Sequence, residues 1–336
     1  MDYRNYPAGV VEDIVRLRRR MEAARVPEKQ VDHNLLIATW NIRNFGGVYE
    51  QFGENPGSPK RNLRALACIA EVIRRFDVVA VQEVKADTTG IRMLLRDFLG
   101  SDWGMIASDV AAGARGNLER LAFVYDKRRV QPSGLAGELV LPPVASGDPQ
   151  QQFDRTPYIV GFQSAHESFA LLTAHIRYGA QPAERLPELQ SFAQYVAGEL
   201  RTRAKGKGEE TNLIVLGDFN IDDRGDNPLF QAFVSSGLVV PEELLNVKST
   251  YNTKPKFYDQ IAWFMGDLDL PATGRAGSVD FAGAVFKEQS LSEMTYRMSD
   301  HFPLWVEFIT ERSSERMAGV LGVDAAAPNP FAAVPD

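Results

Sequence analysis

Residues with chemically useful side chains stand at the ends of several apolar runs in this sequence of 336 residues. The clearest case is LIVLG (213–217), which is followed by Asp218 and Asn220, two oxygen-bearing side chains with one residue between them. Alternation along an extended chain directs both side chains to the same side. The pattern recurs, with Asn41 after LLIATW, Glu83 after VVAVQ, His175 at the end of FALLTAH, Asp259 near the start of YDQIAWF, and Asp300 and His301 before FPLWVEF.

These side-chain types suit the hydrolysis of a phosphate ester. Carboxylate and amide oxygens favour Mg²⁺, with Mn²⁺ or Ca²⁺ as alternatives, whereas four histidines and one cysteine disfavour a zinc site. A hard cation neutralises the phosphate, and imidazoles move protons near neutral pH. Each position alone has another interpretation, because Asn and Asp after a strand are common turn residues. Their recurrence at strand ends, where covered sheets carry their sites, favours one shared site.

The apolar runs predict the elements that must position these residues. Runs rich in β-branched and aromatic residues predict strands at 35–40, 77–82, 121–125, 158–162, 169–175, 213–217, 258–264 and 302–308. Apolar residues at helical spacing predict helices within 61–76, 90–100 and 187–200, and Asn227 before Pro228 predicts a further helix start. Several strands are almost entirely apolar and others come in hairpin pairs, so we expect a sandwich of mixed sheets with helices outside.

The beginning of the chain predicts one amphipathic helix, because Val10, Ile14, Leu17 and Met21 recur at helical spacing between charged residues. This helix either docks on the main domain or binds a partner. We expect an N-terminal helical extension (1–30), one domain (31–312) and a disordered tail (313–336) that ends in the Ala- and Pro-rich sequence AAAPNPFAAVPD.

The composition narrows the classes of partner. The formal net charge is -7 and the pI is about 5.3, whereas proteins that hold nucleic acid by phosphate contacts alone are usually basic. A nucleic acid would therefore need local Arg and Lys residues or bound cations. Cys68 is the single cysteine, which excludes an intramolecular disulfide. The N-terminal sequence lacks a continuous apolar stretch, so we expect a cytoplasmic protein without a signal peptide, a transmembrane helix or a membrane partner.

Six segments resemble the ordered motifs of the endonuclease/exonuclease/phosphatase superfamily: ATWNIRNFG, VAVQEV, LLTAHIRYG, VLGDFNID, YDQIAWF and MSDHFPLWVEF. The resemblance covers residues 34 to about 310 and is nearest to deoxyribonuclease I. It implies an α/β (α+β) fold, a four-layer sandwich of two mixed β-sheets flanked by helices. It also implies cleavage of phosphate esters that depends on a divalent metal.

The resemblance also implies a role for each residue of the site. The metal ligands would be Glu83, Asn41 and Asp300. Asp218 and Asn220 would orient water and phosphate, or hold a second cation. His301, supported by Asp259, would be the general base or a phosphate-stabilising cation, and His175, supported by Glu119 of NLERLAFVYD, would be the general acid. Arg155 of FDRTPYIVGF would bind the phosphate, and Asn117 stands at a substrate-contacting position where deoxyribonuclease I has a tyrosine.

We therefore expect a Mg²⁺-dependent nuclease, and specifically an endonuclease that acts on DNA. The candidate basic clusters are Lys60, Arg61 and Arg64; Arg201, Arg203, Lys205 and Lys207; and Lys248, Lys254 and Lys256. Four aromatic residues in or after the site loops are candidates either for stacking on bases or for packing within loops, namely Phe45, Tyr49, Phe52 and Tyr178.

The alternative function is that of a phosphatase or phosphodiesterase on a small ester, such as a nucleotide, a sugar phosphate or a phospholipid head group. The acidic net charge fits this alternative. A third interpretation, a binding module without activity, is disfavoured because the residues of all six motifs are intact. The sequence leaves the oligomeric state open.

Overall fold

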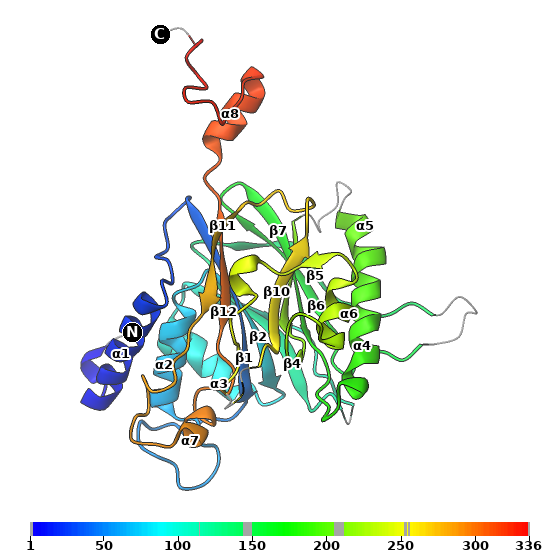
Figure 1. Cartoon of the computed structure of the whole chain (residues 1–336). Coiled ribbons are helices and arrows are strands. Elements are labelled where there is room, and N and C mark those ends of the chain that lie inside the picture. Colours follow the sequence, from blue (N-terminus) through cyan, green and yellow to red (C-terminus); the bar gives the residue numbers. More distant parts are fainter. Residues whose placement is uncertain are drawn as a thin grey trace.

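The computed structural model describes residues 3–113, 115–143, 150–204, 212–251, 254 and 256–334. In this part of the chain, two six-stranded β-sheets pack face to face, and helices cover their outer faces (Figure 1). The expected four-layer sandwich of two mixed sheets is therefore confirmed.

The first sheet has the strand order β11-β12-β1-β2-β4-β3. Its strands are β1 (Asn34–Phe45), β2 (Val78–Lys85), β3 (Trp103–Ala107), β4 (Glu119–Asp126), β11 (Ala272–Ser278) and β12 (Leu304–Ile309). Strands β1 and β2 are parallel, and the other neighbours are antiparallel. The parallel pair directs two strand ends to the same edge of the sheet.

The second sheet has the order β5-β6-β7-β8-β10-β9. Its strands are β5 (Gln131–Glu138), β6 (Tyr158–Ser164), β7 (Glu167–His175), β8 (Leu213–Asp218), β9 (Leu238–Val239) and β10 (Asp259–Phe264). Here β7 and β8 are the parallel pair. Each sheet thus contributes one parallel pair at its centre.

The helices form the outer layers, with α1 and α2 beyond the first sheet and α4 to α6 beyond the second (Figure 1). The first group comprises α1 (Ala8–Ala23), α2 (Leu63–Ile73), α3 (Thr89–Met93) and the π-helical turn η2 (Leu94–Leu99). The second comprises α4 (Pro182–Tyr195), the π-helical turn η3 (Val196–Leu200), α5 (Arg201–Ala204) and α6 (Pro228–Val234). Shorter elements are η1 (Tyr3–Asn5), η4 (Glu242–Leu244) and α7 (Leu291–Thr295). Among the described residues, no helix is long and apolar enough to cross a bilayer.

Strand alternation divides the core into two parts. On β1, Leu35 and Ile37 face the second sheet, whereas Leu36 and Ala38 face the helices α1 and α2. A polar link crosses between the sheets beneath the site, because Gln82 on β2 donates hydrogen bonds to Thr39 Oγ1 (3.1 Å) and, in the other sheet, to Thr173 Oγ1 (2.9 Å). These polar groups are buried and hydrogen-bonded to one another. The link therefore favours the one packing of the two sheets that brings the three side chains together.

Two predicted helix features have clear counterparts. The helix expected near the N-terminus is α1, and its apolar face, which includes Ile14 and Leu17, is buried in the core around α2. The expected helix start at Asn227 is also present, since the Asn227 side chain accepts hydrogen bonds from the N–H groups of Leu229 and Phe230 at the start of α6.

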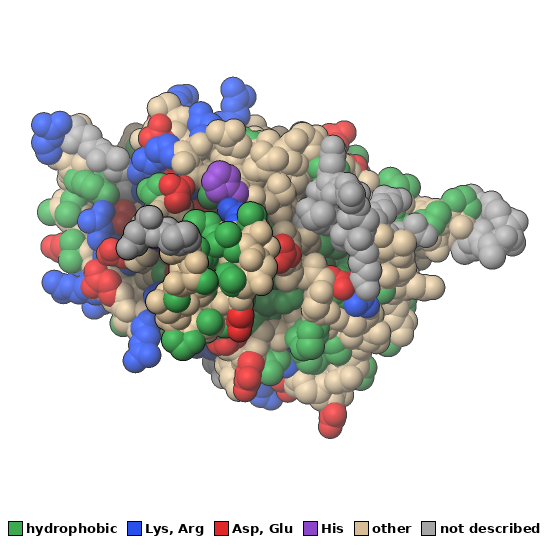
Figure 2. Space-filling view, turned by 90° about the horizontal axis from the view of Figure 1, so that it is seen from above, with side chains coloured by type: hydrophobic (Ala, Val, Ile, Leu, Met, Phe, Trp, Pro, Cys, Tyr) green, Lys and Arg blue, Asp and Glu red, His purple; other side chains and the backbone are tan. Residues whose placement is uncertain are grey.

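Part of the segment expected to be a disordered tail is helical. Residues Ser313–Leu321 form α8, which begins with an Arg312–Glu315 ion pair and ends at Gly322 in the left-handed conformation. The helix stands away from the sheets (Figure 1). Its exposed side chains include Met317, Val320 and Leu321, and hydrophobic side chains gather at this end of the molecule in the view from above (Figure 2). The boundaries at residues 30 and 312 stay a prediction.

Candidate active site

Strand register assembles the centre of the site around Asp218. In the second sheet, Asp218 at the end of β8 pairs with His175 at the end of β7 on one side and with Asp259 on β10 on the other. Gly217, at φ 146°, makes this approach possible, because a Cβ there would lie 2.1 Å from the Ala174 carbonyl oxygen. The apolar run of β8 therefore ends in a glycine directly before Asp218, where β7 brings His175 and β10 brings Asp259 next to β8.

The first sheet reaches the same point through Asn41 of β1, where the regular pairing of β1 with β2 is interrupted. The Asn41 amide donates hydrogen bonds to Glu83 Oε1 and to Asp218 Oδ2, both at 2.9 Å. Glu83 Oε2 accepts a further bond from the Asn44 N–H at 2.8 Å. The two parallel strand pairs thus direct their polar ends into one site that spans both sheets.

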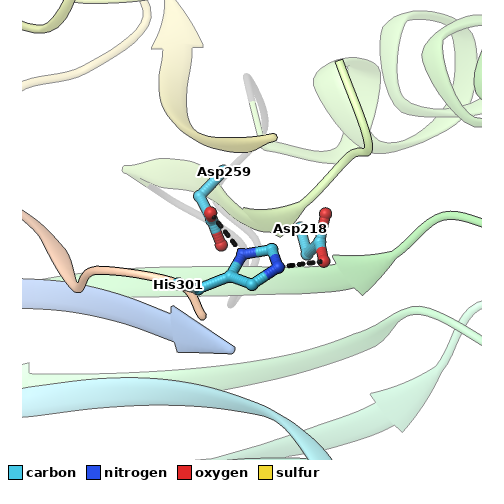
Figure 3. A group of neighbouring side chains, drawn as sticks. All are labelled: Asp218, Asp259 and His301. Carbon is cyan, nitrogen blue, oxygen red and sulfur yellow. Dashed lines mark hydrogen bonds and ion pairs between the residues drawn. The ribbon is translucent and has the colours of Figure 1, made fainter. Parts of the chain in front are cut away.

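His301 lies between two carboxylates (Figure 3). Its Nδ1 is 2.8 Å from Asp259 Oδ2, and its Nε2 is 3.8 Å from Asp218 Oδ2. Although burial opposes protonation, the negative charges of Asp259 and Asp218 raise the pKa of His301 to about 10.

The two carboxylates around this imidazole have opposite pKa shifts. Burial raises the pKa of Asp259, and His301 does not fully offset that effect. Burial also acts on Asp218, but His301, His175 and the Asn41 amide together hold its pKa below the usual value. Asp218 is therefore the better-stabilised anion of the two.

His175 forms a second pair with Glu119 of β4. The distance from His175 Nδ1 to Glu119 Oε2 is 3.1 Å, although the angle departs from that of a hydrogen bond, and His175 Nε2 lies 3.5 Å from Asp218 Oδ2. Glu119 also accepts bonds from Lys85 Nζ (3.0 Å), Asn117 Nδ2 (2.6 Å) and Arg155 Nε (2.5 Å). Burial raises the pKa of Glu119, but His175, Arg155 and Lys85 outweigh it and hold that pKa well below its usual range.

The side chain of Asn220 lies at the site, but strand alternation is not the reason, contrary to the expectation from the sequence. Strand β8 ends at Asp218, and Asn220 lies in the left-handed region at φ 51°, so simple strand alternation does not orient it. Its Nδ2 donates to the Ile176 carbonyl (2.7 Å), and its N–H donates to Asp218 Oδ1 (3.0 Å). Asn220 therefore helps hold the turn after β8 as well as facing the cleft.

These residues line an open cleft of about 420 Å³. Its walls contain Glu83, Asn117, Glu119, Arg155, His175, Asp218, Asn220, Asp300 and His301, together with Arg43, Asn44, Tyr178 and Tyr258. Of the predicted site residues, Asn41 and Asp259 lie behind the walls, where they bind Asp218 and His301 respectively. The structure thus brings together all of the predicted catalytic, phosphate-contacting and metal-binding side chains.

Sequence reasoning missed Arg43, Asn44 and Tyr258 in the cleft walls. Arg43 had a signal, because it stands two residues after Asn41 on β1 and so falls on the same face. Its guanidinium lies over the Tyr296 ring at 4.1 Å, and its Nη1 is 3.5 Å from Asp300 Oδ2.

Two buried side chains behind the cleft hold its loops, and the sequence gave no sign of this role. Arg61, predicted as part of a basic cluster, is only 3% exposed and donates to the carbonyls of residues 43, 44, 297 and 298. Ser299 Oγ donates to the Asn41 carbonyl (2.7 Å) and accepts from the His301 N–H (3.0 Å). Both residues tie the end of β1 to the segment that carries Asp300 and His301.

The other predicted basic residues are mostly engaged in ion pairs. Arg64 binds Asp13 and Glu288, and Arg201 binds Asp267. In the third cluster, Lys248 lies 3.5 Å from Asp280, Lys256 lies 2.6 Å from Asp222, and Lys254 is also partnered. Lys205 and Lys207 lie outside the described residues.

The donor atoms at the site fit a hard cation. Asn41 Oδ1 and Asp259 Oδ1 are buried oxygens that have no hydrogen-bond partner among the described residues. Asp218, Asp259 and His301 each offer a ligand atom, and these atoms lie within 4.8 Å of one another, so this group can hold a metal ion. It adjoins the expected ligands Asn41 and Glu83 through the Asn41–Asp218 hydrogen bond, whereas Asp300, the third expected ligand, is partly exposed beside Arg43.

Comparison with known proteins agrees with the fold and the site. Residues 38–261 match the profile of the Endonuclease/Exonuclease/phosphatase family. A deoxyribonuclease of Thioalkalivibrio sp. (strain K90mix) is 26% identical over 323 residues, covering 90% of this chain and 81% of the relative. Deoxyribonuclease gamma of Homo sapiens is 26% identical over 306 residues, covering 82% of this chain and 86% of the relative.

Solved structures share the fold at low sequence identity. The human Nocturnin catalytic domain with bound sulfate superposes with a TM-score of 0.55 at 15% identity, covering 83% of this chain and 95% of that domain. The D. rerio TDP2 complex with a single-strand DNA product has a TM-score of 0.53 at 15% identity, covering 82% of this chain and 98% of that chain.

Fold and site together define a two-sheet hydrolase that acts on phosphoester bonds. Since the family match spans more than half of its length, the chain belongs to the endonuclease/exonuclease/phosphatase family, and its deoxyribonuclease relatives confirm the expected resemblance.

Proposed function

We propose that this protein is a Mg²⁺-dependent endonuclease that acts on DNA. The observation that carries the proposal is the pair of histidines that approach one oxygen of Asp218, at 3.5 Å from His175 and 3.8 Å from His301. Each histidine has its own carboxylate, Glu119 or Asp259. Hydrolysis of a phosphodiester needs one proton to leave the attacking water and one to reach the leaving oxygen, and two imidazoles can serve these two ends.

The residues act in the following way. Arg155 binds a phosphate oxygen through the guanidinium N–H groups that Glu119 does not occupy. Asp218 and Asn220 orient the attacking water. His301, held by Asp259, either accepts a proton from that water as the base or, when already protonated, stabilises the phosphate as a cation while Asp218 accepts the proton of the water. As water attacks phosphorus and the bond to the leaving oxygen breaks, His175 donates its proton to that oxygen. Glu119 keeps the imidazole of His175 oriented.

The metal would be held by Asn41, Glu83 and Asp300, and when bound it would neutralise charge on the phosphate. Oxygen ligands favour Mg²⁺, and Mn²⁺ or Ca²⁺ fit the same donors less selectively. Support for DNA as the substrate comes from the names of the curated relatives, which are deoxyribonucleases.

The second candidate is a phosphatase or phosphodiesterase that acts on a small ester. The net charge of -7 favours it, since an acidic protein repels a long polyanion. Its substrate would need only the cleft around Arg155 and the two histidines.

Cleavage of supercoiled plasmid by the purified protein, with Mg²⁺, Mn²⁺ or EDTA, tests the proposal. We expect metal-dependent nicking that falls by about 10²- to 10⁴-fold in His175→Ala and in Asp218→Asn, because one positioned acid or base contributes on that order. His166→Ala, an exposed histidine in the turn between β6 and β7, is the matched control and should cleave as the wild type does. An inert plasmid, with hydrolysis of a nucleotide or sugar phosphate, would favour the second candidate.

A further inference from the structure

We propose that the catalytic cleft continues past Arg155 into a second subsite, which binds the nucleotide that neighbours the scissile phosphate. The substrate is then a strand of nucleic acid with at least one further phosphate and base, rather than an isolated ester. This inference rests on the proposed nuclease function and deepens it. The subsite is formed by Arg115, Arg177 and Tyr178 together with Arg155.

The catalytic cleft has a neighbouring cavity on the protein surface. A second cavity, of about 590 Å³, lies beside the catalytic cleft and shares Arg155 and Tyr178 with it. Cavities between about 300 and 1,000 Å³ are the usual size for small organic ligands, so this one can hold a nucleotide. Because Arg155 and Tyr178 line both cavities, a strand whose phosphate lies at Arg155 can place its next nucleotide in the second cavity.

Tyr178 supplies a face for a base. Of the four aromatic residues that the sequence offered for stacking, Phe45 is fully buried, and Phe52 packs against Tyr6. Tyr49 is half-buried and donates its hydroxyl to Gln51. Tyr178, in contrast, is 67% exposed and lines both cavities. A base can stack on such a ring whatever its sequence.

The charged groups around Tyr178 favour a phosphate. Arg177 is held by Asp154 (3.0 Å) and Glu188 (3.3 Å), so each of these carboxylates has a cationic partner. Glu184, the other acidic wall residue, accepts the Gln181 N–H in the cap of α4. Arg115 is exposed, and within the described residues no carboxylate pairs with it. Arg115 and the outer N–H groups of Arg155 therefore remain available for phosphate oxygens.

Steady-state kinetics on two substrates, with Mg²⁺, tests the subsite. Bis(p-nitrophenyl) phosphate has one phosphate and no neighbouring nucleotide, whereas a labelled hexadeoxynucleotide has both. The measured quantity is the ratio of kcat/KM for the hexanucleotide to kcat/KM for the small diester. We expect Tyr178→Ala to lower this ratio about fivefold or more, mainly through KM, since a base–aromatic stack contributes at least that much.

Three further variants separate the effect of the subsite from a general loss of ring or charge. Tyr178→Phe keeps the ring and should keep the ratio. Arg115→Ala should lower the ratio and reduce the slope of log(kcat/KM) against log salt by about 0.7, the value for one lost phosphate contact on a single strand. Arg96→Ala, an exposed arginine on η2, removes the same charge away from both cavities and should change neither quantity.

Wild-type ratios and slopes in both Tyr178→Ala and Arg115→Ala would overturn the subsite while leaving the nuclease function intact. Should the wild type cleave only the small diester, the nuclease function fails instead. Fluorescence anisotropy of the labelled hexanucleotide in EDTA then decides the subsite separately. Equal affinity in the wild type and in Tyr178→Ala would overturn it, and at least fivefold weaker binding in the variant would support it.

Discussion

At the scale of single residues, the site depends on Asn41 and Asp218 as links between groups that are distant in sequence. Asn41 joins the two sheets by its bonds to Glu83 and Asp218. Asp218 joins the two histidine pairs through one carboxylate oxygen. Because both residues are buried, each of these links acts with little screening by water.

Glu83→Gln should weaken metal binding, because it removes one of the negative charges that favour a divalent cation. In the wild type we expect Mg²⁺ at a hundred times its Kd to add about 2.7 kcal/mol to the free energy of unfolding, which raises the Tm by a few degrees. Thermal unfolding at increasing MgCl₂ measures the effect. Glu242→Gln, at an exposed glutamate on η4, is the control and should respond as the wild type does. An unchanged Mg²⁺ response in Glu83→Gln would contradict the ligand role.

At the scale of elements, α4 orders two loops of the cleft through one buried carboxylate. Glu188 Oε1 accepts the Asp154 N–H and Glu188 Oε2 accepts the Arg177 N–H, each at 2.7 Å. Asp154 precedes Arg155, and Arg177 follows His175 by two residues. A helix on the outside of the second sheet therefore positions the segments of both the proposed phosphate-binding residue, Arg155, and the proposed proton donor, His175.

Glu188→Gln should lower kcat by ten- to a hundredfold, on the order expected when catalytic groups are misplaced by a fraction of an ångström to one ångström. An amide has only one acceptor oxygen, so its NH₂ group would face one of the two N–H donors. The measurement is kcat and KM on bis(p-nitrophenyl) phosphate, together with the Tm. Gln190→Ala, on the exposed face of α4, is the control. A lower Tm with wild-type kcat would show that Glu188 is merely structural.

The N-terminal helix α1 should contribute to stability through its buried face. Leu17 is fully buried, so Leu17→Ala should lower the free energy of unfolding by about 2–5 kcal/mol. Val15→Ala, at an exposed position on the same helix, is the control and should stay within about 0.5 kcal/mol of the wild type. Urea unfolding followed by tryptophan fluorescence measures both. Equal midpoints for the two variants would mean that α1 does not unfold with the main domain.

At the scale of the whole molecule, a network of charges joins the N-terminal segment to the first sheet. Lys29 lies 3.1 Å from Asp126 and 3.5 Å from Asp77, and Arg129 binds Asp77 at 3.0 Å. Asp126 also accepts bonds from Arg128. Burial would raise the pKa of Asp126, but Arg128 and Lys29 lower it to about 2.

This shift predicts how stability depends on pH. A carboxyl group whose pKa is lower in the folded state stabilises the fold above its unfolded pKa, and that contribution disappears as the pH falls through the folded value. For Asp126 the window runs from about 3.8 down to about 2. Asp126→Asn should therefore be less stable than the wild type at pH 5, and the difference should shrink between pH 4 and pH 2.

Urea unfolding at pH 5, 4, 3 and 2 measures this difference. Asp226→Asn, at an exposed aspartate in the loop before α6, is the control and should show no gap that depends on pH. A gap between Asp126→Asn and the wild type that stays constant across this range would argue against an ion pair as its cause.

The sequence by itself determined the interior of the fold and the chemical types at the site. All eight strands predicted from apolar runs are interior strands, and the four that were missed, β3, β5, β9 and β11, are the edges of the two sheets. Edge strands are covered on fewer sides, so their sequences, such as QPSGLAGE and ATGRAGS, need not be apolar. The polar residues at the ends of interior strands were visible because they interrupt apolar runs abruptly.

Only the tertiary structure decided how these residues meet. No spacing in the sequence pairs His175 with Glu119 or assigns one Asp218 oxygen to two histidines, because these contacts depend on the register of strands far apart in the chain. The same holds for Arg61, which reads as a surface charge but is buried among carbonyls, and for Tyr178, whose exposure depends on the surrounding loops. Local patterns determine residue types and elements, whereas contacts between distant segments follow from packing.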